Sequence, residues 1–397
     1  MASERVLITG ATGILGSFVL AKALEEGYRP VVLMRDQSVA EARHRLQRVL
    51  ALTGSPEEAG AIEVIRSDVR QRFFNLPPGE LARLCSSIHL VIHCAASVSF
   101  ESNQDTLVWD TNVRGTHNLL EILTDAQVPL YYVSTAYVAG AHDGVRQEHT
   151  VKNGTSFTNV YERSKAHCEQ LVRESMGSGR IAGAILRPSI IVGALKDGHI
   201  VQFLNFYGFL RIVDAIATGR LRPEGVTRFV MAPACTKNLV PADWTADAIW
   251  HIIKREGPSG RTYHLTNDDP PTQDDIFQWA NTLLGGNMPL AMVPDLGERP
   301  TRLERVAHMQ LRTYLPYMLD ETRFDRSNTD RALDGALPLP CLRGPFFDLL
   351  LEYARERQWK RLFHDPAFLL SDKVPAFSPL PRPAEAAACT HTNVVVT

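Results

Sequence analysis

A tyrosine and a lysine lie four residues apart in the segment NVYERSKAHCEQLV, residues 159–172. The segment has the pattern of a helix, and residues i and i+4 share one helical face, so Tyr161 and Lys165 can point to the same place. A phenol can give a proton to an oxygen that gains charge, and a nearby ammonium lowers the pKa of that phenol. The pair is therefore a candidate proton donor. The alternative for an isolated YxxxK is a packed ring beside a solvated lysine.

Three glycines follow the first strand pattern in LITGATGILGSF, at positions 10, 13 and 16. Small residues let the backbone approach a pyrophosphate, whose charge is favoured at a helix N-terminus. The spacing is GxxGxxG instead of GxGxxG, but its place between a strand and a helix predicts a dinucleotide site. The candidate contacts here are Thr9, Gly10, Thr12, Gly13, Ile14, Leu15 and Gly16.

The second strand pattern ends in LMRD, where an NAD site usually has an acidic residue for the ribose 2′-hydroxyl. Arg35 stands there instead and can pair with a 2′-phosphate, which favours NADPH over NADH. Asp36 follows directly and weakens this preference. The alternative for Arg35 is a solvated arginine at the end of a strand.

The elements that must position these groups alternate between strands and helices over the first 195 residues. Runs rich in Val, Ile and Leu predict strands at residues 5–10, 30–35, 61–67, 89–96, 129–135 and 183–193. Helices are expected at residues 14–26, 39–53, 105–126 and 159–176. Continuous apolar runs suit strands that are covered on both faces. The predicted fold class is α/β, a Rossmann-type doubly wound parallel sheet with a smaller C-terminal substrate domain.

The regular alternation of strands and helices ends after residue 195, where loops lengthen and helices become less regular. Two strand-like pieces at 237–242 and 262–267 bracket a helix at 243–255, and we expect them to rejoin the sheet or its edge. The domain prediction is an NADP-binding Rossmann domain at 1–195 with 236–267 returning to it, a substrate-binding domain at 196–235 and 268–378, and a flexible tail at 379–397.

Composition describes an ordinary globular protein: 397 residues, 45% hydrophobic, 22% charged, with a net charge of −2. The scattered charges give no indication of a nucleic-acid partner. The six cysteines have no CxxC pair and no metal-ligand spacing, which predicts reduced thiols, no metal site and a cytoplasmic location. We expect no signal peptide and no transmembrane segment, because the chain enters a strand pattern at once and has no long apolar run. These features make no prediction about oligomeric state.

Taken in order, the glycine turn, Thr135 in VSTAYVAG and the YERSK segment resemble the extended short-chain dehydrogenase/reductases. DTNVRGTHNLLE and LRPSIIVG match further stretches of that superfamily, over about residues 5–270. TGATGILG, LMRDQSVAEARHRL, HCAASVSF, NLVPADWTADAI and FDRSNTDRAL resemble its thioester-reductase branch. That branch includes fatty acyl-CoA reductases and the terminal reductase domains of carboxylic acid reductases and nonribosomal peptide synthetases.

The resemblance implies roles for single residues. Tyr161 is expected to be the general acid, Lys165 to lower its pKa and hydrogen-bond the nicotinamide ribose, and Thr135 to donate to the same substrate oxygen. The further cofactor contacts that it implies are Arg35, Arg45, Asp68, Val69, Ala95, Ala96, Asn112, Tyr161, Lys165 and Pro188. Asp68 as a turn residue, and Asn112 and Arg187 as structural residues, remain alternatives.

The expected function is NADPH-dependent reduction of an acyl thioester, carried by coenzyme A or an acyl carrier protein, to an aldehyde. Further reduction to the alcohol stays open. No adenylation or carrier segment is recognised, so we expect the substrate to arrive activated. Alternatives on the same residues are an NAD(P)-dependent ketone reductase or a sugar-nucleotide epimerase, which Arg211, Arg220, Arg222 and Arg228 leave open. A non-catalytic NADP-binding module would have no use for a proton donor.

The apolar stretch 201–219 is expected to be a helix with two possible roles. It can be the core helix of the substrate domain, or part of it can wall a tunnel for an acyl chain. The apolar side chains that it offers are Leu204, Phe209, Ile212, Val213 and Ile216.

Overall fold

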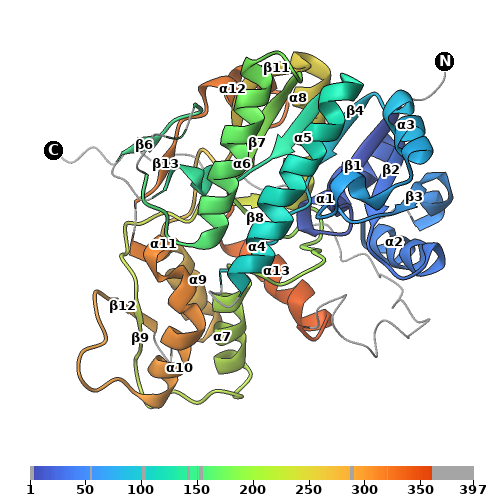
Figure 1. Ribbon diagram of the computed structural model, residues 1–397. Coiled ribbons are helices and arrows are strands. Elements are labelled where there is room, and N and C mark those ends of the chain that lie inside the picture. Colours follow the sequence, from blue (N-terminus) through green and yellow to red (C-terminus); the bar gives the residue numbers. More distant parts are fainter. Residues whose placement is uncertain are drawn as a thin grey trace.

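A seven-stranded sheet forms the centre of the computed structural model, which describes residues 4–53, 56–100, 104–140, 144–149, 151, 155–286, 290–319 and 321–359. The strands are β1 (Arg5–Thr9), β2 (Arg29–Met34), β3 (Glu63–Arg66), β4 (Leu90–His93), β5 (Leu130–Val133), β7 (Gly183–Pro188) and β11 (Ser259–Leu265). Their order is β11-β7-β5-β4-β1-β2-β3, and every neighbouring pair is parallel (Figure 1). The predicted fold class is confirmed.

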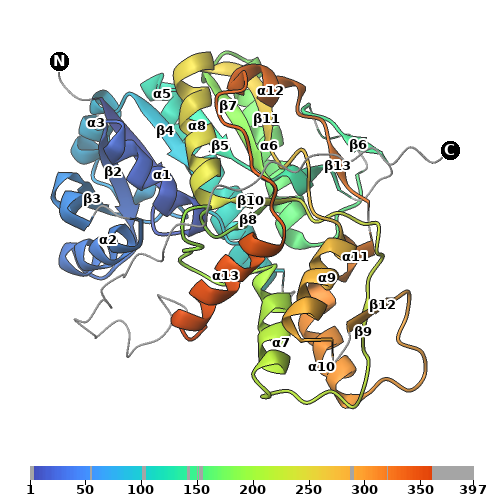
Figure 2. The ribbon, with the colours of Figure 1, turned by 180° about the vertical axis from the view of Figure 1, so that it is seen from behind.

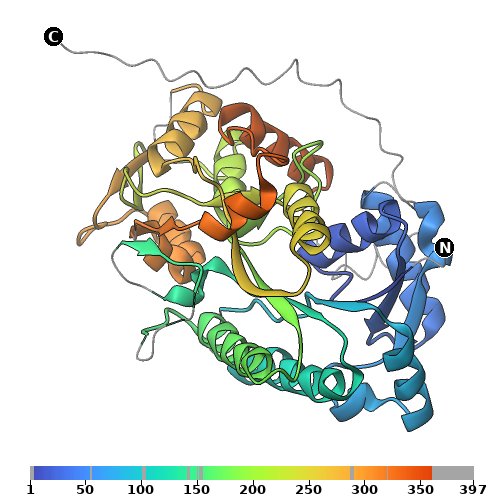
Figure 3. The same ribbon diagram turned by 90° about the horizontal axis from the view of Figure 1, so that it is seen from above.

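Helices cover both faces of this sheet, as the view from above shows (Figure 3). One face carries α1 (Ile14–Glu25), α2 (Val39–Thr53) and α8 (Ala242–Glu256), seen in Figure 2. The other carries α3 (Pro78–Ser87), α4 (Asp105–Trp109), α5 (Gly115–Ala126) and α6 (Val160–Gly177). A π-helical turn at Asp110–Arg114 joins α4 to α5 within the single helix expected at 105–126. Short 3₁₀ helices lie at Pro56–Ala61, Arg72–Asn75, Ala136–Ala139 and Arg312–Tyr314.

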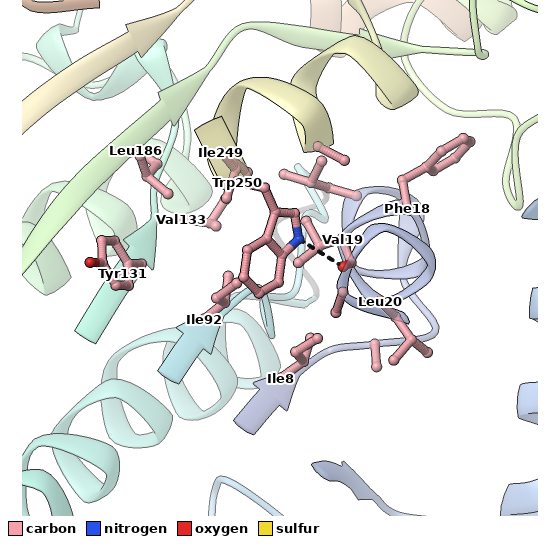
Figure 4. Close-up of a cluster of buried hydrophobic side chains, with 14 of the residues drawn as sticks. Ile8, Phe18, Val19, Leu20, Ile92, Tyr131, Val133, Leu186, Ile249 and Trp250 are labelled. Carbon is pink, nitrogen blue, oxygen red and sulfur yellow. Dashed lines mark hydrogen bonds between the residues drawn. The ribbon is translucent and has the colours of Figure 1, made fainter. Parts of the chain in front are cut away.

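The strands are apolar on both faces because both faces are covered. In β1, Val6 and Ile8 belong to the core under α1 and α8, whereas Leu7 belongs to the core on the opposite face. Trp250 of α8 is fully buried against the sheet, and its indole N–H donates to the Val19 carbonyl of α1 at 3.1 Å (Figure 4). This bond fixes α8, from the later part of the chain, beside the first helix.

The run predicted as one strand at 183–193 is divided at Ser189 into β7 and β8 (Ile190–Val192). Pro188 ends β7, and proline cannot donate to the ladder. Beyond it the chain changes partner, because the Ser189 N–H donates to Leu265 whereas the Ile190 N–H donates to Asn238. β10 (Leu239–Pro241) therefore pairs with β8 in a separate two-stranded sheet, and of the two returning pieces only β11 joins the large sheet.

A second hydrophobic core lies beyond the carboxyl ends of the sheet strands. It is built by α7 (Tyr207–Ala217), α9 (Gln273–Leu283), α10 (Arg302–Leu311), α11 (Leu315–Leu319) and α13 (Gly344–Glu356), with the parallel pair β9 (Thr227–Val230) and β12 (Leu290–Val293). These elements form a lobe below the sheet in Figures 1 and 2. Most of the predicted substrate domain is in this lobe. Residues 360–397, which include the predicted tail, lie outside the described residues.

One segment of the predicted substrate domain instead packs on the sheet. β13 (Arg323–Phe324) pairs with β6 (Val145–Arg146), and α12 (Ser327–Leu333) packs against α8 and β11. The buried Glu148 carboxylate explains this return, because it accepts hydrogen bonds from the backbone and hydroxyl of Thr329 and from the backbone of His264. None of the helices in the described ranges is both long and apolar enough to cross a membrane.

Candidate active site

The glycine turn between β1 and α1 is packed too tightly for side chains. Gly10 has a φ of +69°, and a Cβ there would lie 2.7 Å from the Ala95 backbone. A Cβ on Gly16 would lie 2.1 Å from the Gly10 carbonyl oxygen. Gly13 is the N-cap of α1 and has no side chain to cap it, so the first N–H groups of the helix are available to an anion. The turn fits a pyrophosphate.

One pocket of about 550 Å³ begins at this turn and continues to the lobe of the second core. The predicted site residues that line it are Gly10, Thr12, Gly13, Ile14, Leu15, Gly16, Arg35, Arg45, Val69, Ala95, Ala96, Thr135, Tyr161, Lys165 and Pro188. The glycine turn and the YxxxK helix are 145 or more residues apart in sequence. The fold brings these two distant segments together at one cavity.

Three predicted cofactor contacts, Thr9, Asp68 and Asn112, are absent from the pocket lining that the described residues form. The Thr9 hydroxyl is hydrogen-bonded to His93 Nδ1 at 2.8 Å and accepts a hydrogen bond from the Ala95 N–H. It therefore ties the end of β1 to the end of β4, next to the glycine turn. The Asp68 carboxylate pairs with Arg70 at 2.6 Å. The Asn112 amide binds Ser97 and Ser164 and thereby ties the segment after β4 to α6. These contacts support neighbouring parts of the fold, and a cofactor contact of the three residues stays a prediction.

Two arginines border the pocket where the second strand ends. Arg35 is exposed, whereas Arg45 of α2 is partly buried and its guanidinium lies 3.3 Å from Asp36. Burial lowers the pKa of Arg45, and Asp36 opposes that shift. The Arg45 Nε has no hydrogen-bond partner among the described residues although it is buried. A 2′-phosphate placed between the two guanidinium groups would give it one.

The proton-donor candidate lies at the start of α6. The Asn159 side chain caps this helix by accepting the Glu162 N–H at 2.9 Å, which fixes the first turn and places Tyr161 in the pocket. Burial raises the pKa of Tyr161 above its usual value, and a hydrogen bond with the Thr135 side chain acts in the opposite direction. The phenol is therefore held protonated beside the Thr135 hydroxyl, and the net shift of its pKa is opposite to the lowering expected from Lys165, because burial dominates.

Lys165 is almost completely buried one turn further along α6. Its ammonium donates to the Tyr132 hydroxyl at 2.9 Å and to the Val133 carbonyl oxygen at 2.5 Å. Burial lowers the pKa of Lys165 to about 8. The site thus contains a cation at neutral pH that is held by the end of β5.

The model of the family described as Male sterility protein matches residues 8–249, which is more than half of the chain. The chain belongs to this family. It lies within the thioester-reductase branch of the extended short-chain dehydrogenase/reductases, as this family match and the relatives below support.

Two curated relatives illustrate the male sterility family match. Aldehyde reductase lnaA of Aspergillus flavus is 24% identical over 89% of this chain and 36% of its own length. Fatty acyl-CoA reductase 2 of Mus musculus is 25% identical over 66% of this chain and 58% of its own length. The chain therefore spans only part of the length of these relatives.

Solved structures share the fold. The terminal R domain from the myxalamid PKS-NRPS biosynthetic pathway superposes with a TM-score of 0.76 at 24% identity, over 91% of this chain and 92% of that one. A UDP-glucose-4-epimerase from Stenotrophomonas maltophila with bound NAD superposes with a TM-score of 0.65 at 20% identity, over 90% of this chain and 99% of that one. At these identities the likeness shows the fold alone.

The far end of the pocket in this male sterility family member is apolar. Its lining there includes Leu204, Phe206, Phe209, Ile276, Phe277, Leu311 and Met318. The rings of Phe209 and Phe277 stack with centroids 5.4 Å apart. Helix α7 begins at Tyr207 and not at residue 201, so Leu204 is in the loop before it, whereas Ile212 and Val213 are in the core. Phe209 belongs both to the pocket lining and to the second core, and the role of this stretch as the wall of an acyl tunnel stays a prediction.

Several pocket residues lie outside the predicted set of site residues. They are Phe100, Tyr137, Glu162, Gln202, Asn205, Lys237, Gln273, Tyr314 and Tyr317. Tyr317 of α11 donates to the Glu162 carboxylate at 2.5 Å, and the Phe100 ring lies 5.8 Å from the Tyr161 ring. Three of them have a sequence clue, because Glu162 follows Tyr161 directly, Tyr137 lies in VSTAYVAG and Phe100 ends HCAASVSF.

The arginines considered for a nucleotide diphosphate are engaged elsewhere. Arg220 binds Asp214, Arg228 binds Glu304 at 2.7 Å, and Arg211 stacks on Trp359. Neither these three nor Arg222 contributes to the pocket lining in the described part of the chain. Arg187 is also structural, since it is buried in an ion pair with Glu169 at 2.6 Å.

Proposed function

We propose that this protein reduces an acyl thioester to an aldehyde with NADPH as the reductant. It is an NAD(P)H-dependent oxidoreductase. The observation that carries the proposal is a single pocket that joins the glycine turn, the Thr135–Tyr161–Lys165 group and an apolar end. Membership of the thioester-reductase branch supports the same reaction.

The residues toward the N-terminus would hold the cofactor. The first N–H groups of α1 and the glycine turn take the pyrophosphate, and Arg35 and Arg45 take the 2′-phosphate. Lys165 binds the ribose next to the nicotinamide. Bound in this way, NADPH supplies the hydride for the reaction.

The chemical work of the chain itself is to hold the carbonyl oxygen and to move one proton. The thioester oxygen would lie between the Tyr161 and Thr135 hydroxyls, which stabilise the negative charge that develops on it. Tyr161 gives its proton to that oxygen, and Lys165 makes the loss of this proton easier by its positive charge. Overall, one hydride and one proton convert the thioester into an aldehyde and a free thiol.

The apolar end would bind the acyl chain. Each buried CH₂ group contributes about 0.8 kcal/mol, so apparent affinity should rise roughly fourfold per methylene until the space is filled. Two aromatic side chains, Phe206 and Phe209, line this end at the start of α7. We propose coenzyme A or an acyl carrier protein as the donor of the acyl group.

A sugar-nucleotide epimerase or a ketone reductase has less support. A nucleotide diphosphate needs cations beyond the nicotinamide, and the four arginines considered for this role do not line the pocket in the described ranges. A simple ketone would make no use of the apolar end. The intact Thr135–Tyr161–Lys165 group argues against a module that only binds NADP.

The test is NADPH oxidation by the purified chain with acyl-CoAs of increasing length, simple ketones and UDP-sugars. We expect kcat/KM to climb with acyl length and then fall, with aldehyde and free thiol formed together. Activity on UDP-sugars or ketones with a flat profile across the acyl-CoAs would contradict the proposal. Tyr161→Phe, run in parallel, shows that the turnover belongs to this site.

A further inference from the structure

The environment of the Lys165 ammonium leaves little freedom in its direction. An ammonium has three N–H donors. One donates to the Tyr132 hydroxyl at 2.9 Å and another to the Val133 carbonyl oxygen at 2.5 Å. One donor is left for the pocket that Lys165 lines. The Nζ also lies 4.3 Å from the centroid of the Tyr132 ring, close enough for a cation–π contact.

Tyr132 is placed for this contact by the alternation of β5. Successive side chains of a strand point to opposite faces of the sheet. Tyr132 is fully buried in the core under α5 and α6, whereas its neighbour Tyr131 is buried in the core under α1 and α8. The chain therefore contains two adjacent buried tyrosines, of which only Tyr132 reaches Lys165.

The Tyr132 hydroxyl is itself held in position. The Cys168 side chain of α6 lies beside it in the same core, and the Cys168 thiol donates to the Asn112 carbonyl oxygen at 3.2 Å. Tyr132 is thus packed between the Lys165 ammonium and Cys168, which is bonded to the π-helical turn at Asp110–Arg114. The hydroxyl is thereby oriented with a lone pair toward the ammonium.

Other titratable groups face Lys165 from the elements around it. On β4 and just after it, His93 is neutral because burial lowers its pKa to about 3, and burial raises the pKa of Cys94 to about 12. On α6, Cys168 has a raised pKa because of burial, and Glu169 is ionised in its pair with Arg187. Among the described residues, none of these four groups accepts a hydrogen bond from the ammonium. Tyr132 supplies the side-chain acceptor.

We propose that Tyr132 is a positioning residue that fixes the Lys165 ammonium, so that its remaining N–H is presented to the nicotinamide ribose. The proposal rests on the proposed function, in which Lys165 binds that ribose. It adds that the direction and the charge of Lys165 depend on a hydroxyl outside the pocket. Tyr132 itself touches neither substrate nor cofactor.

The expected pH effect follows from the sign of this interaction. A hydroxyl acceptor favours the charged form of Lys165 and opposes the burial that lowers its pKa to about 8. Below this pKa the ammonium can bind the ribose, and the ability is lost as the pH rises through it. Tyr132→Phe removes the acceptor but keeps the ring, so the loss should occur at a pH about one unit lower.

The first measurement needs no cofactor. Lysine labelled with ¹³C at Cε is incorporated, the Lys165 signal is assigned by its absence from Lys165→Met, and its pKa is read from an NMR titration. We expect a value near 8 in the unmodified protein, a value about one unit lower in Tyr132→Phe, and no change in Tyr131→Phe. Tyr131→Phe is the matched control, since it removes a buried hydroxyl from the same strand.

The second measurement is the Kd of NADPH as a function of pH for the same variants. As the pH rises, the affinity for NADPH should decline through the pKa that NMR gives for Lys165 in each protein. This decline should occur at a lower pH in Tyr132→Phe than in Tyr131→Phe. Equal Lys165 titrations in Tyr132→Phe and the unmodified protein, or equal shifts in both variants, would overturn the proposal. If Tyr132→Phe does not fold, an NOE between the Lys165 ε-protons and the Tyr132 ring in the unmodified protein decides the contact. Its absence refutes the proposal.

These outcomes separate the positioning role from the proposed function. If the Lys165 pKa falls in Tyr132→Phe alone but the protein reduces no thioester, Tyr132 remains the residue that positions Lys165. Only the assigned reaction is then removed. Thioester reduction with an unshifted Lys165 signal would keep the function and remove Tyr132. A lowered melting temperature alone, without the shift in titration, indicates a purely structural tyrosine.

Discussion

Arg35→Ala should remove most of the preference of this protein for NADPH over NADH. Arg35 is exposed at the end of β2 and lines the pocket, so its guanidinium can bind a 2′-phosphate through two N–H groups. A hydrogen bond to a charged group contributes about 1.5–3 kcal/mol, and about 1.4 kcal/mol is a tenfold change in Kd. We therefore expect the Kd of NADPH to rise about tenfold to a hundredfold, while the Kd of NADH stays the same.

Arg45 should contribute less than Arg35 because Asp36 already faces it at 3.3 Å. A 2′-phosphate has to share the Arg45 guanidinium with this carboxylate, which offsets part of the gain. By the same reasoning, removal of the negative charge of Asp36 should strengthen NADPH binding instead of weakening it. Asp36→Asn should tighten NADPH binding, because it removes a negative charge next to the phosphate.

The assay is isothermal titration of each variant with NADPH and NADH at one salt concentration. Arg43→Ala is the control, since Arg43 is exposed on the same helix as Arg45 but is not part of the described pocket lining. Equal affinity of the unmodified protein for the two cofactors would refute the reasoning. A loss of NADPH affinity in Arg43→Ala as large as that in Arg35→Ala would also refute it. Such a result would mean that any removed positive charge on this surface weakens binding.

Three further changes test other parts of the site. Tyr161→Phe should lower turnover by about 10²–10⁴ and leave the Kd of NADPH unchanged, and a normal turnover would show that the proton comes from another group. Gly16→Ala should weaken NADPH binding, because its Cβ would lie 2.1 Å from the Gly10 carbonyl oxygen. Gly79→Ala, where the added Cβ meets nothing within 4 Å, should bind normally, and equal losses would exclude a local effect on the turn. Phe209→Leu should move the preferred acyl length upward in kcat/KM profiles, since it shortens a side chain that lines the apolar end, and an unchanged optimum would place the acyl chain elsewhere.

The elements of the sheet and the first half of the pocket could be predicted because their signals are local. The glycine turn is specified by consecutive residues between β1 and α1, and the YxxxK pair by the period of one helix. The strands lie within a few residues of the expected runs, because both faces of the sheet are covered and the strands are continuously apolar. For such elements the sequence pattern and the structure contain the same information.

The second half of the pocket depends on contacts between distant residues and could not be predicted in this way. Tyr317 reaches Glu162 across 155 positions, and no periodicity of α11 indicates that contact. The return of β13 to β6 likewise depends on Glu148, which as a single acidic residue in the sequence has no distinctive pattern. The break at Ser189 could have been inferred from Pro188 alone, since proline interrupts a ladder.

The return of the chain at residues 323–333 has a consequence for how the protein is made. Helix α12 completes the cover on α8 and β11, and α13 then completes the second core. The core under α1 and α8 and the second core therefore both receive their last helix from the final part of the described chain. During synthesis, which proceeds from the N-terminus, these two cores gain their last helix late. The core under α5 and α6 has no member beyond Ile185 among the described residues, so it can pack earlier than the other two.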